Sequence, residues 1–250
     1  MRRVLLLAGT AEARALAGAL AAQPLQVTAS LAGATRAPLD LGVATRVGGF
    51  GGVAGLCDYL RAEDIAAIVD ATHPFAAQMS AHAAAARRET GVPLVHLRRP
   101  EWQAGPGDDW AVFADLEAAA AALPKGARAF LGTGRGSASA FLGRTDTALT
   151  LRVIDPPEGE RLAPHIAVLE GRAPFTVEEE IETFQRLGTT HLVVKNAGGT
   201  GGFAKLAAAR QLGLPVLMVA RPPVPEGVAV VESVGDALSW VVSGNAPEGA

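Results

Sequence analysis

Short runs of apolar residues alternate along the chain with longer stretches that are rich in alanine. The run Ile65–Asp70 is apolar up to its last residue, as expected of a strand that is buried on both faces of a sheet. Stretches such as residues 11–22 combine alanine and leucine with polar residues at helical spacing. Because strands alternate with helices in this pattern, we predict an α/β protein with parallel sheets covered by helices.

The same pattern predicts where the individual elements lie. Strands are predicted at residues 3–8, 25–30, 45–47, 65–70, 93–97, 110–113, 127–131, 147–154, 191–195 and 215–220. Helices are predicted at residues 11–22, from 52 to about 60, 72–91, 115–123, from 137 to about 142, 176–187, 203–212 and 235–242.

The tripeptide at residues 124–126 marks the expected domain boundary. It consists of proline, lysine and glycine, and after it the order of strand, Gly-Thr turn and helix begins again. We therefore predict a first domain at residues 1–124, a second at residues 125–244 and a frayed tail at residues 245–250. The expected architecture is two Rossmann-like domains, with parallel sheets flanked by helices and a ligand cleft between them.

Composition narrows the range of partners. Hydrophobic residues make up 49% of the chain but aromatic residues only 5%, which suits alanine-rich helices packed on aliphatic strands. The net charge of −3 gives no reason to expect nucleic acid or an anionic membrane as a partner. The single cysteine, Cys57, excludes an intrachain disulfide and a cysteine-based metal cluster, and we expect it to be buried on a helix.

The beginning of the chain shows no export signal. Its apolar run at residues 4–8 is too short for a signal peptide and leads directly into a turn. No apolar run approaches the roughly 20 residues of a membrane span. We expect a cytoplasmic protein, with a monomer as the working state.

Gly9 and Thr10 follow the first strand and are expected to bind a phosphate group. Gly9 allows a sharp turn at the carboxyl end of the strand, and Thr10 can cap the next helix, whose free N–H groups attract anions. The later glycines of the GxGxxG fingerprint are missing. A capped strand–helix turn without a ligand is therefore the alternative interpretation.

The end of the second strand indicates the type of dinucleotide. NAD-binding folds usually place an acidic residue there, whereas this strand ends at Ser30 and is followed by Arg36. A hydroxyl and a guanidinium suit a 2′-phosphate, which favours NADPH over NADH. The alternative is that Arg36 is a solvated surface charge.

Asp70, Thr72 and His73 lie where a buried strand meets a helix. Ligands bind at the carboxyl edge of open α/β sheets, so these polar residues are candidates for cofactor contacts. Pro74 is expected in the first helical turn, with Thr72 or His73 as the cap. His73 could contact the cofactor or donate a proton. His82 is expected to be an ordinary packed or surface residue, and no metal site is predicted.

A glycine-rich loop between Lys195 and Lys205 is the candidate anion site of the second half. Backbone N–H groups of this loop, together with the two ammonium charges, could bind phosphate or carboxylate. The loop is not a Walker A motif, because it lacks Gly-Lys-Ser/Thr. A second glycine-rich turn, at residues 132–136, contains Arg135 and repeats the arrangement. The loop's own candidates are Asn196, Gly198 and Gly199.

Taken together, these motifs resemble the precorrin-6A reductase family of cobalamin biosynthesis. The most specific match is Asp-Ala-Thr-His-Pro-Phe-Ala at residues 70–76. Further matches lie at residues 9–14, 30–33, 47–52 and 195–206, so the resemblance runs from about residue 4 to residue 220. Ala8 departs from the pattern, because the family usually has a glycine at that position.

The resemblance implies NADPH-dependent reduction of one carbon–carbon double bond of precorrin-6A, a ring-contracted tetrapyrrole, to give precorrin-6B. It also implies that NADPH binds mainly to the first domain and that the macrocycle lies in the interdomain cleft. With the motifs above, the cofactor candidates are Gly9, Thr10, Glu12, Ser30, Gly33, Arg36, Gly49, Asp70, Thr72 and His73. The candidates for binding the macrocycle are Arg135, Lys195, Asn196, Gly198, Gly199 and Lys205. His73, Glu12 or water is expected to supply the proton that accompanies hydride transfer.

Three other functions are compatible with parts of the sequence. An NADPH-dependent reductase of the same fold could act on another carboxylate-rich substrate. A non-catalytic module that senses dinucleotides would bind NADPH without oxidising it, although the pair of glycine-rich halves indicates a second ligand. A methyltransferase would use S-adenosylmethionine, which has no phosphate, so Ser30 and Arg36 speak against it.

Overall fold

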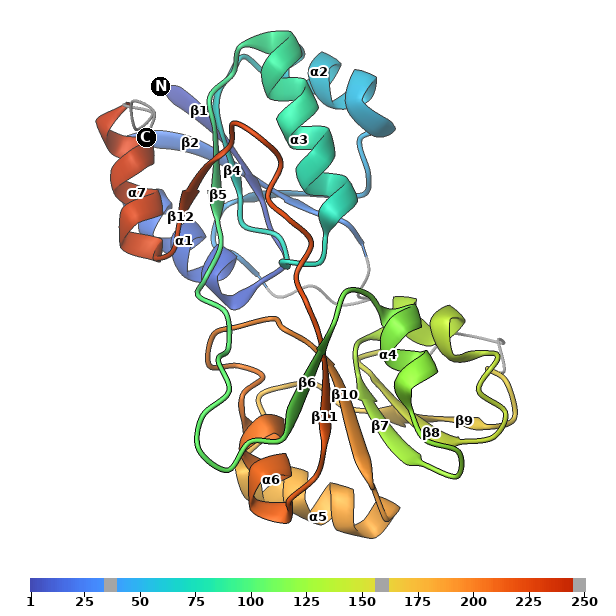
Figure 1. The fold of residues 1–250 in the computed structure, drawn as a ribbon. Coiled ribbons are helices and arrows are strands. Elements are labelled where there is room, and N and C mark those ends of the chain that lie inside the picture. The colour runs from blue at the N-terminus through green and yellow to red at the C-terminus, as the bar shows by residue number, and fades with distance from the viewer. Residues whose placement is uncertain (34–39, 156–161, 245–250) are drawn as a thin grey trace. The chain divides into compact units, whose positions relative to one another are not determined.

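The computed structural model describes residues 1–33, 40–155 and 162–244. The chain forms two compact units, one made of Met1–Pro100 and Pro222–Ala250 and the other of Glu101–Arg221. Each unit contains one six-stranded sheet, and all strand pairs are parallel (Figure 1). The predicted α/β class with two parallel sheets is confirmed.

The first unit is built around strand β1. Its strands lie in the order β12 (Ala229–Val231), β5 (Leu94–Leu97), β4 (Ile65–Asp70), β1 (Arg2–Leu7), β2 (Leu25–Leu31) and β3 (Ala44–Val47). Its helices are α1 (Ala11–Ala21), α2 (Gly52–Ala62), α3 (Ala77–Thr90) and α7 (Val234–Ser243). Val4 and Leu6 pack in one core with α1 and α7, whereas Leu5 and Leu7 pack in another with α2 and α3. Because successive side chains of a strand point to opposite faces, β1 fills both cores.

The second unit is built in the same way around strand β7. Its strands lie in the order β6 (Trp110–Phe113), β11 (Val216–Val219), β10 (His191–Lys195), β7 (Arg128–Gly132), β8 (Ala148–Val153) and β9 (Ile166–Glu170). Its helices are α4 (Leu116–Ala122), α5 (Val177–Leu187), α6 (Ala204–Leu212) and the 3₁₀ helix η1 (Arg135–Phe141). Phe130 of β7 packs edge-on against Phe184 of α5, with ring centroids 5.0 Å apart, in a core that α6 completes.

Both sheets repeat one strand order. If β6 and β12 are counted as the sixth strand of their units, each sheet reads 6-5-4-1-2-3. This is the order of the doubly wound fold that binds dinucleotides. Ligands of such sheets bind at the carboxyl edge where the order reverses, which in the first unit lies between β1 and β4.

Each sheet takes its sixth strand from the place in the chain where the sixth strand of the other sheet would be expected. Strand β6 follows β5 but pairs with β11, and β12 follows β11 but pairs with β5, as the colours of Figure 1 show. Arg98 fixes the returning segment of the first unit, since its N–H donates to the Val231 carbonyl and its Nη2 to the Pro222 carbonyl, each at 2.8 Å. The expected boundary at residues 124–126 therefore falls inside the second unit. The local pattern marks where a strand begins but not which sheet it joins.

Most other predicted elements agree with the structure to within a few residues at their ends. The prediction lacks strands β9 and β12, each of which lies at one edge of its sheet. The predicted helix near residues 137–142 is the 3₁₀ helix η1. Cys57 is buried on α2, as predicted.

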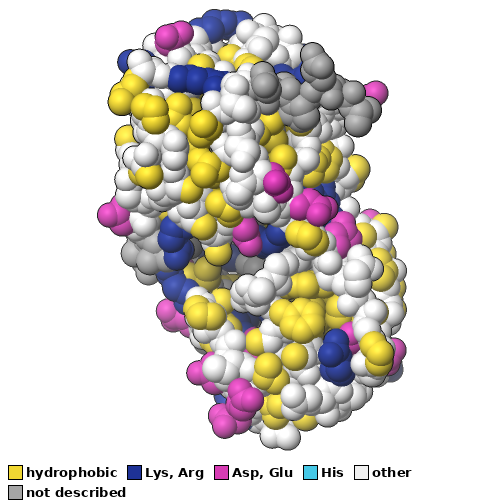
Figure 2. All heavy atoms as spheres, turned by 90° about the vertical axis from the view of Figure 1, so that its left-hand side faces the viewer, with side chains coloured by type: hydrophobic (Ala, Val, Ile, Leu, Met, Phe, Trp, Pro, Cys, Tyr) yellow, Lys and Arg dark blue, Asp and Glu magenta, His cyan; other side chains and the backbone are white. Residues whose placement is uncertain are grey.

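None of the helices in residues 1–33, 40–155 and 162–244 is both long and apolar enough to cross a membrane. On the face shown in Figure 2, basic and acidic side chains are interspersed, in keeping with the small net charge.

Candidate functional site

A cavity of about 700 Å³ lies at the carboxyl edge of the first sheet. Its walls come from the ends of β1, β2 and β4, the glycine-rich turn before α2 and the first turns of α3. The structure brings together the predicted cofactor residues Gly9, Ser30, Gly49, Thr72 and His73 on these walls. This is the position at which doubly wound sheets bind their ligands.

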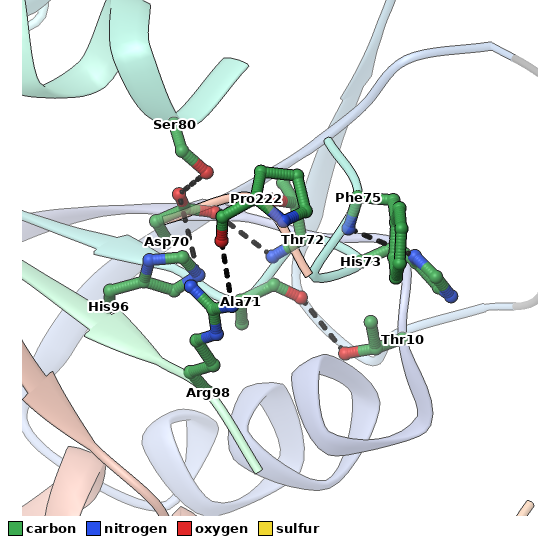
Figure 3. A network of polar contacts seen from close by, with 10 residues as sticks. All are labelled: Thr10, Asp70, Ala71, Thr72, His73, Phe75, Ser80, His96, Arg98 and Pro222. Carbon is green, nitrogen blue, oxygen red and sulfur yellow. Dashed lines mark hydrogen bonds and ion pairs between the residues drawn. The ribbon is translucent and has the colours of Figure 1, made fainter. Parts of the chain in front are cut away.

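Thr10 connects the turn after β1 to the turn after β4, on either side of the point where the strand order reverses. Its Oγ1 accepts the N–H of Ala13 at 3.1 Å, which caps α1, and donates to the Ala71 carbonyl at 2.9 Å (Figure 3). Gly9 has a φ of 145°, a conformation that residues with side chains rarely adopt. One hydroxyl thus holds the turn after β1 against the turn after β4.

We expect Thr10→Ala to lower the free energy of unfolding by about 1–2 kcal/mol. The variant loses the cap of α1, which by itself is worth about 1 kcal/mol, and the tie to Ala71. Chemical denaturation of both proteins measures the difference. Thr10→Ser keeps the hydroxyl and is the matched control; if it were destabilised as much as Thr10→Ala, the loss would come from the methyl group and not from these two hydrogen bonds.

Asp70 positions the turn after β4. Its side chain is buried, and Oδ1 accepts the N–H and the hydroxyl of Thr72 at 3.1 and 2.6 Å. Oδ2 accepts the hydroxyl of Ser80 at 2.6 Å and lies 3.9 Å from Nε2 of the buried His96 (Figure 3). Asp70 does not line the cavity. We therefore assign it a positioning role, in place of the expected contact with the cofactor.

His73 lies exposed in the turn that precedes α3. Its Nδ1 accepts the N–H of Phe75 at 3.2 Å, and its carbonyl accepts the N–H of Ala76 at 2.7 Å (Figure 3). Because Nδ1 acts as an acceptor, neutral His73 is assigned its proton on Nε2. Helix α3 begins only at Ala77, so the predicted start at residue 72 is wrong and neither Thr72 nor His73 caps the helix.

Three cavity residues at the start of α3 were absent from the predicted site: Gln78, Met79 and His82. They lie on one face of the helix, because residues three and four apart are neighbours there. His82, which was expected to be an ordinary packed or surface residue, lines the cavity with them. The misplaced start of the helix concealed this shared face.

Arg46 of β3 supports the opposite wall and was also not predicted. Its Nη1 donates to Ser30 Oγ at 2.7 Å and to the Gly48 carbonyl at 3.0 Å, and its Nη2 donates to the Gly49 carbonyl at 3.0 Å. The guanidinium carbon lies 3.8 Å from the ring centroid of Phe50. The signal in the sequence is an arginine two residues before a Gly-Gly-Phe-Gly-Gly turn.

Two other predicted residues of the first unit, Glu12 and Gly33, do not line the cavity. Glu12 forms an ion pair with Arg99, with Oε2 and Nη1 2.5 Å apart. This contact occupies the carboxylate that was expected to donate a proton. Gly33 follows β2 with a φ of 78° and does not line the cavity. Arg36 lies outside the described residues.

In the second unit, the predicted substrate residues gather at the carboxyl edge of the sheet. Lys195 ends β10, and Gly198 and Gly199 follow it with φ values of 65° and 69°. Arg135 is exposed at the start of η1, directly after β7. Asn196 is different, because its buried amide is used internally: Oδ1 accepts the N–H of Trp102 at 2.9 Å and Nδ2 donates to the Trp102 carbonyl at 3.0 Å.

Lys205 lies in a closely fitted position at this edge. Its Nζ donates to the Gly202 carbonyl at 2.7 Å, and a Cβ added to Gly132 would lie 3.2 Å from its Cδ. Burial lowers the pKa of Lys205 from 10.5 to about 8. Burial also lowers the pKa of Lys195. Both lysines are thus less hydrated than surface lysines and are suited to binding an anion.

A buried ion pair supports the same edge from inside the unit. Arg152 of β8 donates from Nη1 and Nη2 to the two carboxylate oxygens of Glu180, at 2.8 and 2.6 Å. The guanidinium lies over the rings of Phe130 and Phe175, 4.6 and 4.2 Å from their centroids. Glu180 is almost completely buried. This pair could not be predicted, because nothing in the local sequence indicates that the two residues meet.

The described part of the chain holds no group of three histidine, cysteine, aspartate or glutamate residues that could bind a metal ion. What it holds is a cavity beside the N-terminal turn of a helix, together with hydroxyl and guanidinium groups. Such groups bind phosphates and carboxylates.

The fold and the cavity define a protein of the doubly wound, dinucleotide-binding class. The family model "Precorrin-6x reductase CbiJ/CobK" matches residues 3–242. The chain belongs to this family of oxidoreductases.

Relatives that match nearly the whole length of the chain belong to the same family. The chain is 47% identical to the precorrin-6A reductase of Rhodobacter capsulatus over 100% of both sequences. It is 48% identical to that of Rhodococcus erythropolis, over 96% of this chain and 98% of the relative. A solved structure of "CobK precorrin-6A reductase" matches with a TM-score of 0.93 at 46% identity and covers 100% of both chains. The resemblance stated from the sequence motifs is confirmed.

Proposed function

We propose that the chain reduces one carbon–carbon double bond of precorrin-6A to give precorrin-6B, with NADPH as the hydride donor. The names of the relatives support the substrate. The observation that carries the cofactor is the end of β2, where Ser30 lines the cavity at a position that NAD-binding folds give to an acidic residue. The reaction is expected to take place in the cytoplasm, with the chain acting as a monomer.

The walls of the cavity suit a dinucleotide. The turn at Gly9 and Thr10 presents the first N–H groups of α1 to a pyrophosphate. Ser30 is assigned to the adenosine ribose together with Arg36, and Gly49 and Thr72 line the remaining walls. When bound, NADPH supplies the hydride. These residues hold the donor in one orientation, which is the main contribution that a protein makes to such a transfer.

The second unit supplies the contacts for a polyanionic macrocycle. Lys195, Lys205 and Arg135 provide positive charge, and Gly198 and Gly199 allow a carboxylate to approach backbone N–H groups. Conjugation through the ring nitrogens spreads the negative charge that develops as the double bond accepts the hydride. The chain therefore needs to position the substrate more than to activate it.

A proton must reach the carbon next to the one that accepts the hydride. Glu12 is engaged by Arg99, which leaves His73 and water as the donors we favour. His73 lies on the cavity wall, and it would donate a proton as the imidazolium, because loss of the Nε2 proton from the neutral ring would leave an imidazolate.

Anaerobic single-turnover experiments test both the reaction and the role of His73. With wild-type protein, NADPH and precorrin-6A should react together, so that the nicotinamide and macrocycle absorption bands change at the same rate. A protein that binds NADPH without oxidising it is a sensor, and oxidation only with a different tetrapyrrole would indicate another substrate.

We expect His73→Ala to slow hydride transfer by roughly 10²–10⁴-fold, the usual contribution of a general acid. His191→Ala is the control, because it removes an imidazole at the start of β10 that does not line this cavity. Equal rates for His73→Ala and wild type would leave water as the proton source.

A further inference from the structure

Trp102 is hydrogen-bonded at three points to the glycine-rich loop at residues 196–203, which joins β10 to α6. Its N–H donates to Asn196 Oδ1 at 2.9 Å, and its carbonyl accepts from Asn196 Nδ2 at 3.0 Å. Its indole Nε1–H donates to the Gly199 carbonyl at 2.6 Å. Only 8% of Trp102 is exposed. The residue is therefore tied to the first residue of the loop and to its middle.

The sequence of the loop explains why it depends on such support. Gly198 and Gly199 are consecutive glycines with φ values of 65° and 69°. Glycine enters and leaves this left-handed region readily, so consecutive glycines do not fix one backbone path by themselves. The indole N–H of Trp102 bonds directly to the second of them and thereby favours one conformation of the turn.

The ring of Trp102 also sets the position of Lys205. The Lys205 Nζ lies 5.8 Å from the ring centroid, within the range of a cation–π interaction. The same nitrogen donates to the Gly202 carbonyl at 2.7 Å. A Cβ added at Gly202 would lie 2.9 Å from this nitrogen and 3.2 Å from Trp102 Cη2. The ammonium, the glycine and the ring thus fit together so closely that a methyl group at residue 202 would displace one of the other two.

These contacts bear on the groups proposed to bind the macrocycle. Asn196 directly follows Lys195, and Gly199 belongs to the pair that lets a carboxylate approach backbone N–H groups. Lys205 supplies an ammonium. Trp102 itself belongs to the buried core of the second unit, so it can act on a ligand through the loop. A loop that is fixed before its ligand arrives loses less conformational entropy on binding.

We propose that Trp102 is a positioning residue for the substrate: its indole N–H and ring hold Gly199 and Lys205 in the arrangement that binds the carboxylates of the macrocycle. This inference rests on the proposed function, which places the substrate at this loop. It gives a role to a tryptophan that lies 94 positions before Asn196 in the chain.

Trp102→Phe tests the inference, because it keeps a ring in the core and removes the indole N–H. Hydrogen–deuterium exchange of residues 196–203 should become faster by roughly 3- to 10-fold, the range for loss of one hydrogen bond. With saturating NADPH, the KM for precorrin-6A should rise by a similar factor and kcat should stay at the wild-type value, because the change affects substrate binding only. Trp110→Phe, the same change on β6, is the matched control and should alter neither measurement.

A second pair of variants tests the fit around Lys205 without altering Trp102. Gly202→Ala inserts a methyl group against the ammonium and the ring, so it should also raise the KM for precorrin-6A. Gly201→Ala is its matched control, because a Cβ at that residue meets no atom within 4 Å, and it should behave as wild type. Equal KM values for these two variants would show that the ring does not set the position of Lys205, and the inference would be overturned.

The outcomes separate this inference from the proposed function. Unchanged exchange in Trp102→Phe would mean that the loop keeps its shape without the indole, which overturns the inference. Faster exchange with an unchanged KM overturns it as well, because the loop would then not bind the substrate. A lower kcat at unchanged KM has the same consequence, since it reports only a loss of active protein. In all three cases wild type still reduces precorrin-6A and the proposed function stands. Wild type that does not reduce it contradicts the proposed function, and the inference falls with it.

Discussion

Replacing Glu180 with alanine is expected to lower the free energy of unfolding by about 3–5 kcal/mol, the usual cost of removing one partner of a buried ion pair. The variant leaves the guanidinium of Arg152 buried between Phe130 and Phe175 without the two carboxylate oxygens that now bind it. Urea denaturation of the variant and the wild type measures the difference.

Glu182→Ala is the matched control for this prediction, because it removes an exposed glutamate from the same helix. It should change the free energy of unfolding by no more than about 0.5 kcal/mol. Combining Glu180→Ala with Arg152→Met removes both charges, and the double variant should be more stable than the sum of the two single changes implies. Additive losses would show that the two charges are not coupled.

The architecture could be predicted because each strand and helix carries its own local signal. The unbroken apolar run of β4 and the capped turn at Thr10 needed no knowledge of the rest of the chain. Strand pairing is a different kind of information. Trp110–Phe113 has the same alternation whichever sheet it joins, so its pairing with β11 could not be deduced from its sequence. The domain boundary was misplaced for this reason.

The parts of the candidate site that could be predicted are those that lie within one short segment of the chain. The turn that contains Gly9 and the segment around Thr72 and His73 both lie at the cavity. Polar residues within these motifs still divide into two groups that the sequence does not distinguish. Thr72 lines the cavity, whereas Asp70, two residues earlier, faces inward and holds Thr72 in place.

Contacts between distant segments account for what the sequence analysis missed. Arg46 is informative only once β3 is known to pair with β2, because that register brings it to Ser30. Likewise, the amide of Asn196 is occupied by Trp102, a residue 94 positions away, so a motif residue expected to bind substrate has a structural role. Local patterns identify which segments form the site, and the tertiary contacts decide which of their side chains can bind a ligand.

The second large effect is expected at Lys205 and depends on pH. Burial lowers the pKa of Lys205 to about 8 in the folded chain, against 10.5 for an ordinary lysine. Below pH 8 both the folded and the unfolded chain carry the proton, so the folded state bears the full cost of a buried ammonium. Between about pH 8 and 10.5 the unfolded chain binds a proton that the folded chain has released, and the free energy of unfolding therefore rises with pH.

Lys205→Met removes this dependence. The variant should gain stability relative to wild type at pH 7, and that gain should shrink by about 1–3 kcal/mol between pH 7 and pH 10. Lys125→Met, which removes an exposed lysine from the same unit, is the control and should show a constant difference. A constant difference for Lys205→Met as well would mean that the ammonium is hydrated in the folded chain. The close fit around Gly132 and Gly202 would then not shield it from water, and Lys205 would be no better prepared than a surface lysine to bind a carboxylate of the substrate.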